Sequence, residues 1–404
     1  MSQFEFIDKR VPIALDNPSI YHDISKCKNC TLCRRACADV MSVLDYYDLE
    51  STGDVPMCIH CGQCAAACPF DSMHARSELV DRLKNGGTIP QFTSCCPAWV
   101  RFAEIYFPEL IPNLSSTRSC IAMEAAMIKT YFAEKKGINP ANIVSVSVNP
   151  CTAKKAETKR VEENAAARYY DDESLGMDTD ISMTTREFIR WLNDEGVDFG
   201  SLEDSKFDDL IGMETGASII FGNTGGVMEA AMRTAYKLIT DKEPPPYALT
   251  HLEDVRGMNG VKEATVQLGD DVTLSVAVVH GGKNTRDFLN TLKESGKHYD
   301  FIEVMACPGG CIGGGGQPRT KLPQAVKTKE ARIGGLYKAD EEYKYVASYE
   351  NPEIQDLYKN FLGEPLGHKA HELLHTHYTD RSAQLGDRKD VVPETCPTSP
   401  KYKG

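Results

Sequence analysis

Apolar and polar residues follow two different periodicities along this chain after residue 88. Short apolar runs that are typical of strands lie at residues 90–93, 143–148, 274–279 and 301–305. Between these runs, apolar residues recur with the period of a helix at residues 121–136, 185–195 and 226–238. Strands that alternate with helices predict an α/β domain in which helices flank the sheets.

Three of the four strand-like runs lead directly into loops that contain cysteine. These loops read TSCCP at 93–97, PCTAKK at 150–155 and MACPGGCIGGGGQP at 305–318. In open α/β sheets, ligands bind beyond the carboxyl ends of the strands. We therefore expect the three loops to converge on one site between two sheet lobes.

The rest of the chain divides into segments of different character. Residues 1–20 are expected to form a loosely structured lead, 21–71 a cysteine-dense module, 72–338 the α/β domain, 339–380 a helical segment and 381–404 a flexible polar tail. The cysteine-dense module has too little apolar core to fold alone, so bound clusters must hold it together. A helix is also expected through residues 78–83, ending at Asn85-Gly-Gly87.

Composition narrows the class of protein. The chain has 404 residues, of which 41% are hydrophobic and 25% charged, and no apolar stretch approaches the ~20 residues of a membrane span. The net charge of −13 argues against a nucleic-acid partner, which would need a basic face. Because the first residues do not resemble a secretion signal, we expect a cytoplasmic location, where cysteines bind metal rather than form disulfides.

Eight of the 15 cysteines form two runs with the same spacing, C-x2-C-x2-C-x3-C. The runs are Cys27, Cys30, Cys33 and Cys37, and then Cys58, Cys61, Cys64 and Cys68. This spacing is typical of bacterial two-cluster ferredoxins, in which the fourth cysteine of each run binds the other cluster. We therefore assign Cys68 to the first 4Fe-4S cluster and Cys37 to the second, within a small ferredoxin-like α+β domain. Zinc is the alternative, but zinc sites rarely repeat this spacing.

The three loops supply further thiols. Four of them, Cys96, Cys151, Cys307 and Cys311, are enough to bind a third cubane. Cys95 is adjacent to Cys96 and cannot easily bind the same iron atom, so we expect it near the metal but not as a ligand. The glycines of the third loop let the backbone close on a bulky cofactor. Taken alone, these loops imply only a buried metal site.

The loops and their flanking segments resemble those of the iron-only (FeFe) hydrogenases. The matching stretches lie within residues 21–380 and read TSCCPAW, PCTAKKAE, FIEVMACPGGCIGGGGQP, ISMTTREF, IFGNTGGVMEAAMR, VRGMNGVKEATV and GHKAHELLHTHY. The resemblance implies reversible hydrogen oxidation and proton reduction at an H-cluster. This cofactor is a 4Fe-4S cubane joined to a diiron subsite with carbon monoxide, cyanide and azadithiolate ligands.

The resemblance also assigns roles to single residues. The cubane ligands would be Cys96, Cys151, Cys307 and Cys311. Cys311 would bridge the cubane to the diiron subsite, Lys154 would hydrogen-bond a cyanide, and Met305 would pack over the bridging carbonyl. Cys95 would exchange protons with the amine of the dithiolate, which is acid–base chemistry beside a cofactor.

Protons in such enzymes usually pass from that cysteine through an acidic residue and a serine to a surface glutamate and arginine. By spacing, Ser115 matches the serine, and Glu78 and Arg82 match the outer pair. The inner acidic position falls on Ala75, which cannot carry a proton. Glu78 and Arg82 could equally form only a helix salt bridge, because they are four residues apart.

Three further departures from the family pattern concern the cofactor pocket. Asn149 and Cys120 replace a methionine and a proline, and we expect both to place polar or softer groups near the diiron subsite. Only residues 69–94 separate Cys68 from Cys95, where relatives carry a longer segment that helps to form one lobe. We expect another copy of the chain, as a homo-oligomer, or a partner subunit to replace that wall. The alternative is that local loops close over the site in a monomer.

The electron partner and the function class are less constrained. Electrons would pass through the two 4Fe-4S clusters to ferredoxin or another redox subunit, and maturation proteins would supply the diiron subsite. A hydrogen sensor and a non-enzymatic hydrogenase-like iron–sulfur assembly protein are the alternative functions. His371-Glu-Leu-Leu-His375 also fits the HExxH motif of zinc proteases, but no third ligand is evident.

Overall fold

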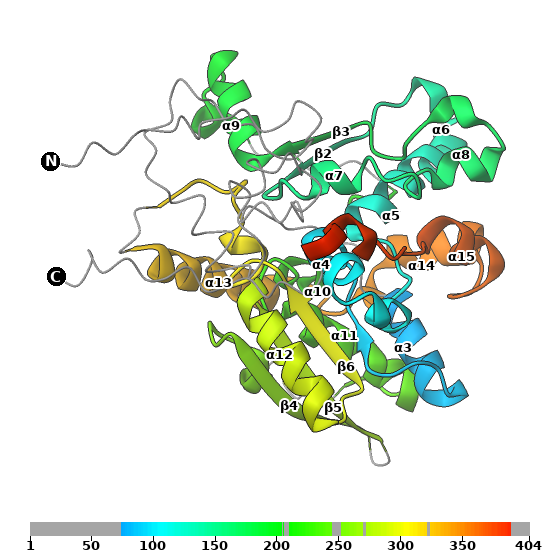
Figure 1. Ribbon diagram of the computed structural model, residues 1–404. Helices are drawn as coiled ribbons and strands as arrows, with labels where there is room; N and C mark the ends of the chain where they lie inside the picture. The colour runs from blue at the N-terminus through cyan, green and yellow to red at the C-terminus, as the bar shows by residue number, and fades with distance from the viewer. Residues whose placement is uncertain are drawn as a thin grey trace, which may run out of the picture.

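The structure is a computed structural model, and it describes residues 74–203, 205, 210–244, 252–269, 272–320 and 324–388 (Figure 1). The expected lead at 1–20 and the cysteine-dense module at 21–71 lie outside the described residues. The same is true of the eight expected ligands Cys27, Cys30, Cys33, Cys37, Cys58, Cys61, Cys64 and Cys68.

Helices of very different lengths surround two sheets. The longer helices are α3 (His74–Asn85), α4 (Pro97–Tyr106), α5 (Cys120–Met127), α9 (Thr185–Asp194), α11 (Gly226–Thr240), α12 (Gly282–Ser295) and α13 (Ala325–Glu342). The shorter ones are α6 (Ala133–Lys136), α7 (Lys154–Glu157), α8 (Ala165–Tyr170), α10 (Gly216–Ile220), α14 (Pro352–Leu357) and α15 (His368–Leu374). Single 3-10 or π turns are η4 (Pro108–Asn113), η5 (Ile128–Phe132), η6 (Pro140–Asn142), η7 (Glu173–Leu175), η8 (Phe199–Ser201), η9 (Glu253–Val255), η10 (Cys311–Gly313), η12 (Ser348–Glu350), η13 (Tyr358–Leu362) and η14 (Ser382–Arg388).

The larger sheet has four strands in the order β1-β6-β5-β4. Strands β1 (Gln91–Phe92), β6 (Phe301–Met305) and β5 (Val272–His280) are parallel, and β4 (Val261–Leu268) is antiparallel at one edge. Every residue of β6 is buried, as expected of a parallel strand covered on both faces. The alternation of strands and helices in the sequence therefore does produce an α/β domain.

Side chains of β5 alternate between two cores, one on each face of the larger sheet. Val276 and Val278 pack in a core with residues of α3 and α11. Ala277 and Val279 pack in a second core with residues of α4 and α12. This two-residue alternation is what a strand between two helical layers requires. The second core also contains the cysteines of the three loops, so the candidate site is built into the main packing of the domain.

A smaller sheet forms a second lobe. Its strands β2 (Val146–Asn149) and β3 (Ile181–Thr184) are parallel. Helix α9 follows β3 through a capping box, in which Thr184 Oγ1 accepts a hydrogen bond from Glu187 N and the Glu187 carboxylate accepts one from Thr184 N. In Figure 1 this lobe lies above the larger sheet, with α9 at its outer end.

The C-terminal segment packs on the helices of the first half of the chain. Leu373 and Leu374 of α15 share a core with Met123 and Met127 of α5. Turn η14 covers α4, with Leu385 buried in the second core, so this part of the expected flexible tail is packed. No helix in the described part of the chain is both long and apolar enough to cross a membrane.

Candidate metal-cluster site

Four buried thiols come together from the three cysteine loops. Cys96 lies between β1 and α4, Cys151 follows β2, and Cys307 and Cys311 follow β6. All four side chains are buried, and all four belong to one hydrophobic core. The ends of strands from both sheets therefore meet at one site, as the spacing of strands and cysteines predicts.

The environment of these thiols favours a metal cluster. Burial raises the pKa of Cys96, Cys151 and Cys311, and negative charge on the neighbouring thiols raises the pKa of Cys151 and Cys311 further. Thiolates at this site therefore need nearby positive charge, which iron atoms would supply. Among the described residues, no three His, Cys, Asp or Glu side chains are grouped closely enough to hold a single metal ion. The four cysteines instead suit a cubane, in which each ligand binds a different iron atom.

The loop after β6 passes the other segments where only glycine fits. Gly310 has a φ of +82°, and a Cβ there would lie 2.7 Å from Thr224 N. At Gly316 a Cβ would lie 2.5 Å from the carbonyl carbon of Pro150, whose oxygen accepts a hydrogen bond from Gly316 N at 3.0 Å. The contact at Gly316 brings the loop of Cys307 and Cys311 directly against the loop of Cys151, and the contact at Gly310 brings it against Thr224.

Backbone N–H groups approach two of the thiols. Ala306 N lies 3.5 Å from Cys96 Sγ, and Lys154 N lies 3.3 Å from Cys151 Sγ. Such contacts stabilise the negative charge of a thiolate and tune the potential of a cluster that it binds. The local backbone therefore fits thiolate ligands at both positions.

Asn149 holds the Cys151 loop through its side-chain amide. Its Oδ1 accepts a hydrogen bond from Cys151 N at 3.0 Å, and its Nδ2 donates to Ser147 Oγ and Ser182 Oγ. All polar atoms of the amide are thus directed at β2, β3 and the following loop. The expectation that Asn149 places a polar group near the diiron subsite stays a prediction.

Lys154 is buried among the thiols and is held by two contacts. Its Nζ donates to Glu157 Oε2 at 2.7 Å and to Cys95 O at 3.2 Å. Burial alone would lower the pKa of Lys154, but the charges of Glu157, Cys120 and Cys151 outweigh it and raise this pKa. Lys154 is therefore a fixed cation beside Cys95, and Cys120 lies close enough to act on it electrostatically.

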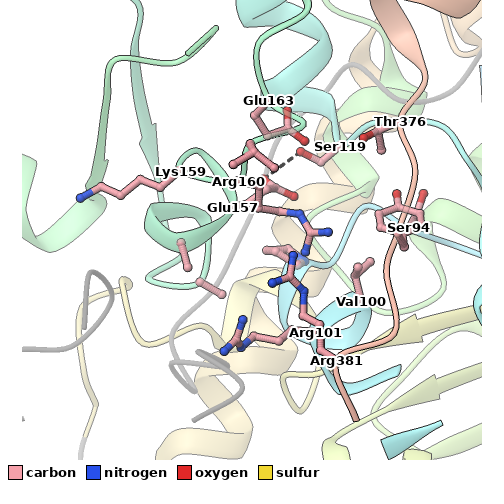
Figure 2. A pocket seen from close by; sticks show the side chains of 15 residues that line it. Ser94, Val100, Arg101, Ser119, Glu157, Lys159, Arg160, Glu163, Thr376 and Arg381 are labelled. Atoms are coloured by element: carbon pink, nitrogen blue, oxygen red, sulfur yellow. Dashed lines mark hydrogen bonds between the residues drawn. The ribbon is translucent and has the colours of Figure 1, made fainter. Parts of the chain in front are cut away.

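Glu157 is a site residue that the sequence reading missed. It also accepts a hydrogen bond from Ser119 Oγ at 2.9 Å, and it lines a pocket of about 310 Å³ beside α4 and α7 (Figure 2). The available signal was its position three residues after Lys154, which places the two side chains on one face of a helix. The pocket is therefore lined by the residue that forms the ion pair with the buried Lys154.

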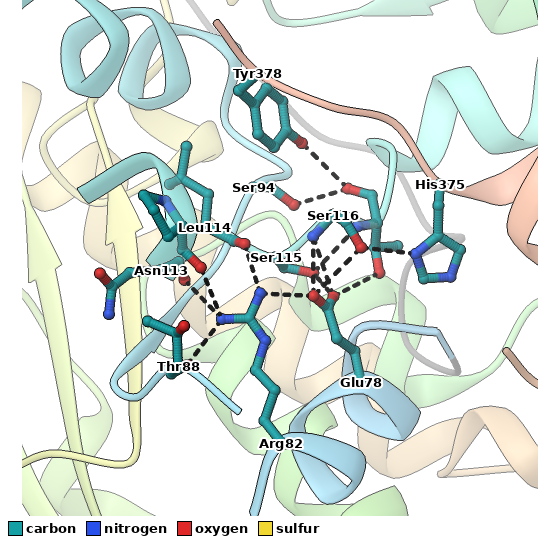
Figure 3. A network of polar contacts seen from close by, with 12 residues as sticks. Glu78, Arg82, Thr88, Ser94, Asn113, Leu114, Ser115, Ser116, His375 and Tyr378 are labelled. Carbon is teal, nitrogen blue, oxygen red and sulfur yellow. Dashed lines mark hydrogen bonds and ion pairs between the residues drawn. The ribbon is translucent and has the colours of Figure 1, made fainter. Parts of the chain in front are cut away.

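The structure brings together the three residues expected at the outer end of a proton path (Figure 3). Glu78 Oε2 accepts from Ser115 Oγ at 2.6 Å, and Glu78 Oε1 pairs with Arg82 at 2.7 Å. Arg82 also donates to the carbonyl oxygen of Leu114 at 2.8 Å. Ala75 lies on α3 one turn before Glu78, and its side chain is outside the described part of the structure.

His375 joins this network from the C-terminal segment, which the sequence reading did not anticipate. Its Nδ1 lies 2.8 Å from Ser116 Oγ, and Ser116 Oγ lies 3.3 Å from Glu78 Oε1. Burial lowers the pKa of His375 to about 4, so its ring is neutral at pH 7. The rings of His371 and His375 stack with their centroids 4.6 Å apart. Among the described residues, no third His, Cys, Asp or Glu side chain joins them to form a group that could hold a metal ion.

Three family models match this chain. The C-terminal domain of the iron-only hydrogenase large subunit matches residues 64–315, the iron hydrogenase small subunit matches 326–381, and a 4Fe-4S dicluster domain matches 19–69. The last of these covers the two cysteine runs that the spacing assigned to ferredoxin-type clusters.

Proteins with similar sequences are named as hydrogenases. Iron hydrogenase 1 of Clostridium pasteurianum is 42% identical over 76% of this chain and 52% of its own length. NADP-reducing hydrogenase subunit HndD of Solidesulfovibrio fructosivorans is 44% identical over 76% of this chain and 51% of its own length. The chain thus spans about half the length of these curated relatives. A solved variant of FeFe-hydrogenase HydA1 from Chlamydomonas reinhardtii has a TM-score of 0.64 and 39% identity, covering 76% of this chain and 81% of that one.

Proposed function

This chain belongs to the iron-only hydrogenase family, and we propose that it interconverts hydrogen with protons and electrons. The observation that carries the proposal is the group of four buried thiols around the cationic Lys154. Family membership alone would leave the activity open, because the chain matches only part of its curated relatives.

The residues of the site fit the ligands of an H-cluster. Its cubane would be bound by Cys96, Cys151, Cys307 and Cys311, with Cys311 bridging to the diiron subsite. When bound, that subsite supplies the metal chemistry of hydrogen cleavage and formation. Lys154 Nζ has three N–H donors and uses two of them among the described residues, so it would have a third to donate to a cyanide ligand of the bound cofactor. Met305, buried at the end of β6, would pack beside the carbonyl ligands.

Protein groups would move the protons. Cys95, buried next to the ligand Cys96, would hold a proton on its Sγ and exchange it with the dithiolate amine. At the outer end of the path, the buried Glu78 would exchange a proton between its Oε2 and Ser115 Oγ, while Arg82 keeps the carboxylate in place. Alanine at position 75 has no group that can carry a proton, so either water bridges the space there or protons take another route.

Electrons would enter through the two 4Fe-4S clusters of the N-terminal module. Ferredoxin or another redox subunit is the proposed partner, and one relative is itself named as a subunit of an NADP-reducing hydrogenase. Maturation proteins would deliver the diiron subsite. A cytoplasmic location remains a prediction, since one relative that is 44% identical is named as periplasmic.

The test is anaerobic expression with the maturation proteins, followed by infrared spectroscopy and a hydrogen-evolution assay. We expect carbonyl and cyanide bands, and about 12 iron atoms per chain when the cubanes alone are reconstituted. Lys154→Met should lose turnover and shift or remove the cyanide bands, whereas Lys155→Met should change neither, because Lys155 pairs with Glu187 outside the site. Normal carbonyl and cyanide bands without any hydrogen turnover would refute the proposed activity.

An iron–sulfur assembly function is the second candidate. Cytosolic Fe-S cluster assembly factor narfl of Xenopus tropicalis is 28% identical over 76% of this chain. The lower identity makes it the weaker candidate, and so does the retention of Cys95, Lys154 and Cys311 at one buried site. An assembly factor would carry its cubanes without turning over hydrogen, so the same assay separates the two functions.

A further inference from the structure

The loop between two of the proposed cubane ligands has a backbone conformation that its own residues do not select. Gly309 and Gly310 lie between Cys307 and Cys311, and their φ angles are +86° and +82°. Glycine adopts positive and negative φ about equally well, so neither residue favours this conformation by itself. Contacts with the surrounding structure must therefore hold the two peptide groups in their orientation.

Gly309 is held at both of its backbone polar groups. Its N–H donates to His280 Nδ1 at 3.1 Å, and its carbonyl oxygen accepts from Thr224 N at 3.1 Å. The first bond fixes the peptide between Pro308 and Gly309, and the second fixes the peptide between Gly309 and Gly310. Thr224 contributes a backbone group, so His280 provides the contact that a substitution can remove.

His280 is itself firmly placed. It is the last residue of β5, and it lies opposite Met305 of β6 in the parallel register. Its N–H donates to Gly260 O at 2.9 Å, and its carbonyl oxygen accepts from Asn284 Nδ2 at 2.8 Å. The residue is 3% exposed, so close packing restricts the ring as well as the backbone.

The ring of His280 is in the state that can accept this bond. A neutral imidazole has one nitrogen that donates and one that accepts, whereas a protonated ring donates from both. Burial, together with the positive charge of Lys262, lowers the pKa of His280 to about 4, so the ring is neutral at pH 7. Because Nδ1 faces the N–H of Gly309, the ring proton lies on Nε2.

We propose that His280 is a positioning residue for the cubane: by accepting from Gly309 N, it fixes the loop that sets the separation of Cys307 and Cys311. These two cysteines would bind different iron atoms of one rigid cluster, so their separation cannot vary freely. Groups that orient metal ligands without touching the metal typically contribute about 10- to 100-fold to metal affinity. The inference rests on the cubane of the proposed function, but it does not depend on hydrogen turnover.

Iron release to a ferrous chelator tests the proposal on the full chain, reconstituted anaerobically without maturation proteins. The wild type should hold about 12 iron atoms, of which about four belong to this cubane. His280→Leu fills a similar volume but has no acceptor, so it should release about four iron atoms at least ~10-fold faster than the wild type. His280→Asn should release them at nearly the wild-type rate, because its Oδ1 can take the place of Nδ1 and accept from Gly309 N.

Two controls separate the lost acceptor from a general loss of stability. Val266→Ala removes buried atoms from the core on the other face of the larger sheet, so it should lower the urea midpoint and leave iron release unchanged. His280→Gln places its carbonyl oxygen one bond further out, at the position of Nε2, and should behave like His280→Leu. If the leucine variant does not fold, the glutamine variant takes its place in the comparison with asparagine.

The outcomes distinguish this inference from the proposed function. Release from His280→Leu or His280→Gln at the wild-type rate would overturn the proposal. Release from His280→Asn or Val266→Ala that is as fast as from His280→Leu would overturn it as well, since the acceptor would then not be the cause. These results leave the cubane itself intact, whereas a wild type with only about eight iron atoms would remove the cubane on which both this inference and the proposed function rest.

Discussion

Replacing Glu157 with glutamine tests how the site holds its buried cation. Lys154 Nζ lies 2.7 Å from Glu157 Oε2, and both side chains are more than nine-tenths buried. Removing one partner of a buried ion pair typically costs about 3–5 kcal/mol, because the other charge is left uncompensated. Cys120 and Cys151 also raise the pKa of Lys154, so we expect Glu157→Gln to cost about 3 kcal/mol, at the lower end of that range.

The neighbouring lysine offers a matched control. Lys155 pairs with Glu187 at 2.8 Å, but these side chains are 22% and 41% exposed. Exposed pairs contribute about 0–1 kcal/mol, and glutamine can still serve at the third helical position of the capping box. Glu187→Gln should therefore cost about 1 kcal/mol or less. Urea unfolding, followed by the fluorescence of the buried Trp99 beside Cys96, measures both variants under anaerobic conditions.

The pH dependence distinguishes an ion-pair effect from a packing effect. In the wild type the pKa of Lys154 is raised, so its stabilising contribution is complete below the unfolded pKa of about 10.4 and constant between pH 6 and 9. In Glu157→Gln the effect of burial is no longer balanced by the carboxylate, so the pKa of Lys154 should fall. The unfolded chain then binds more protons, and the variant should gain stability as the pH rises toward 10. A loss no larger than that of Glu187→Gln, or one that does not change with pH, would refute this reasoning.

Three further variants probe the proton path. Cys95→Ala should keep the carbonyl and cyanide bands but lose most hydrogen turnover, and unchanged turnover would show that protons travel elsewhere. Glu78→Gln should lower turnover by about 10²-fold, since it removes a proton carrier, while Asp81→Asn, exposed on the same helix, should not; equal rates in both would leave Glu78 a purely structural residue. Ala75→Glu puts a carboxyl group one helical turn before Glu78 and should raise turnover in a stopped-flow or electrochemical assay, whereas a rate at or below that of the wild type would argue against a relay through this face of α3.

Periodicity alone located much of the α/β framework. Each of the four predicted runs overlaps a strand, and the predicted helices coincide with α3, α9, α11 and the continuous segment from α5 to α6. Strand β4 was missed because it is an antiparallel edge strand whose residues VKEATVQL alternate with charged and polar side chains. Strand β3 was missed because ISMT is short and only its last residue is buried.

The residues of the candidate site likewise fall into a group that the sequence predicts and a group that it does not. Its cysteines were predictable because strand ends and ligand spacing are local patterns, and neither needs knowledge of distant contacts. The groups that orient the site are not local. Ser115 reaches Glu78 across 37 positions of sequence, and His375 reaches Ser116 across 259. Family spacing suggested Ser115, but no spacing rule connects His375 with it.

Glu157 shows what patterns of neighbouring residues in the sequence cannot predict. Its position three residues after Lys154 was visible in the sequence, but such pairs are usually solvated, as the neighbouring pair of Lys155 and Glu187 is. Only packing decides that one lysine of this dipeptide faces the thiols and the other faces solvent. The chemistry of the site therefore depends on which of two adjacent lysines, Lys154 or Lys155, is buried. The three-dimensional fold determines this, whereas composition and periodicity do not.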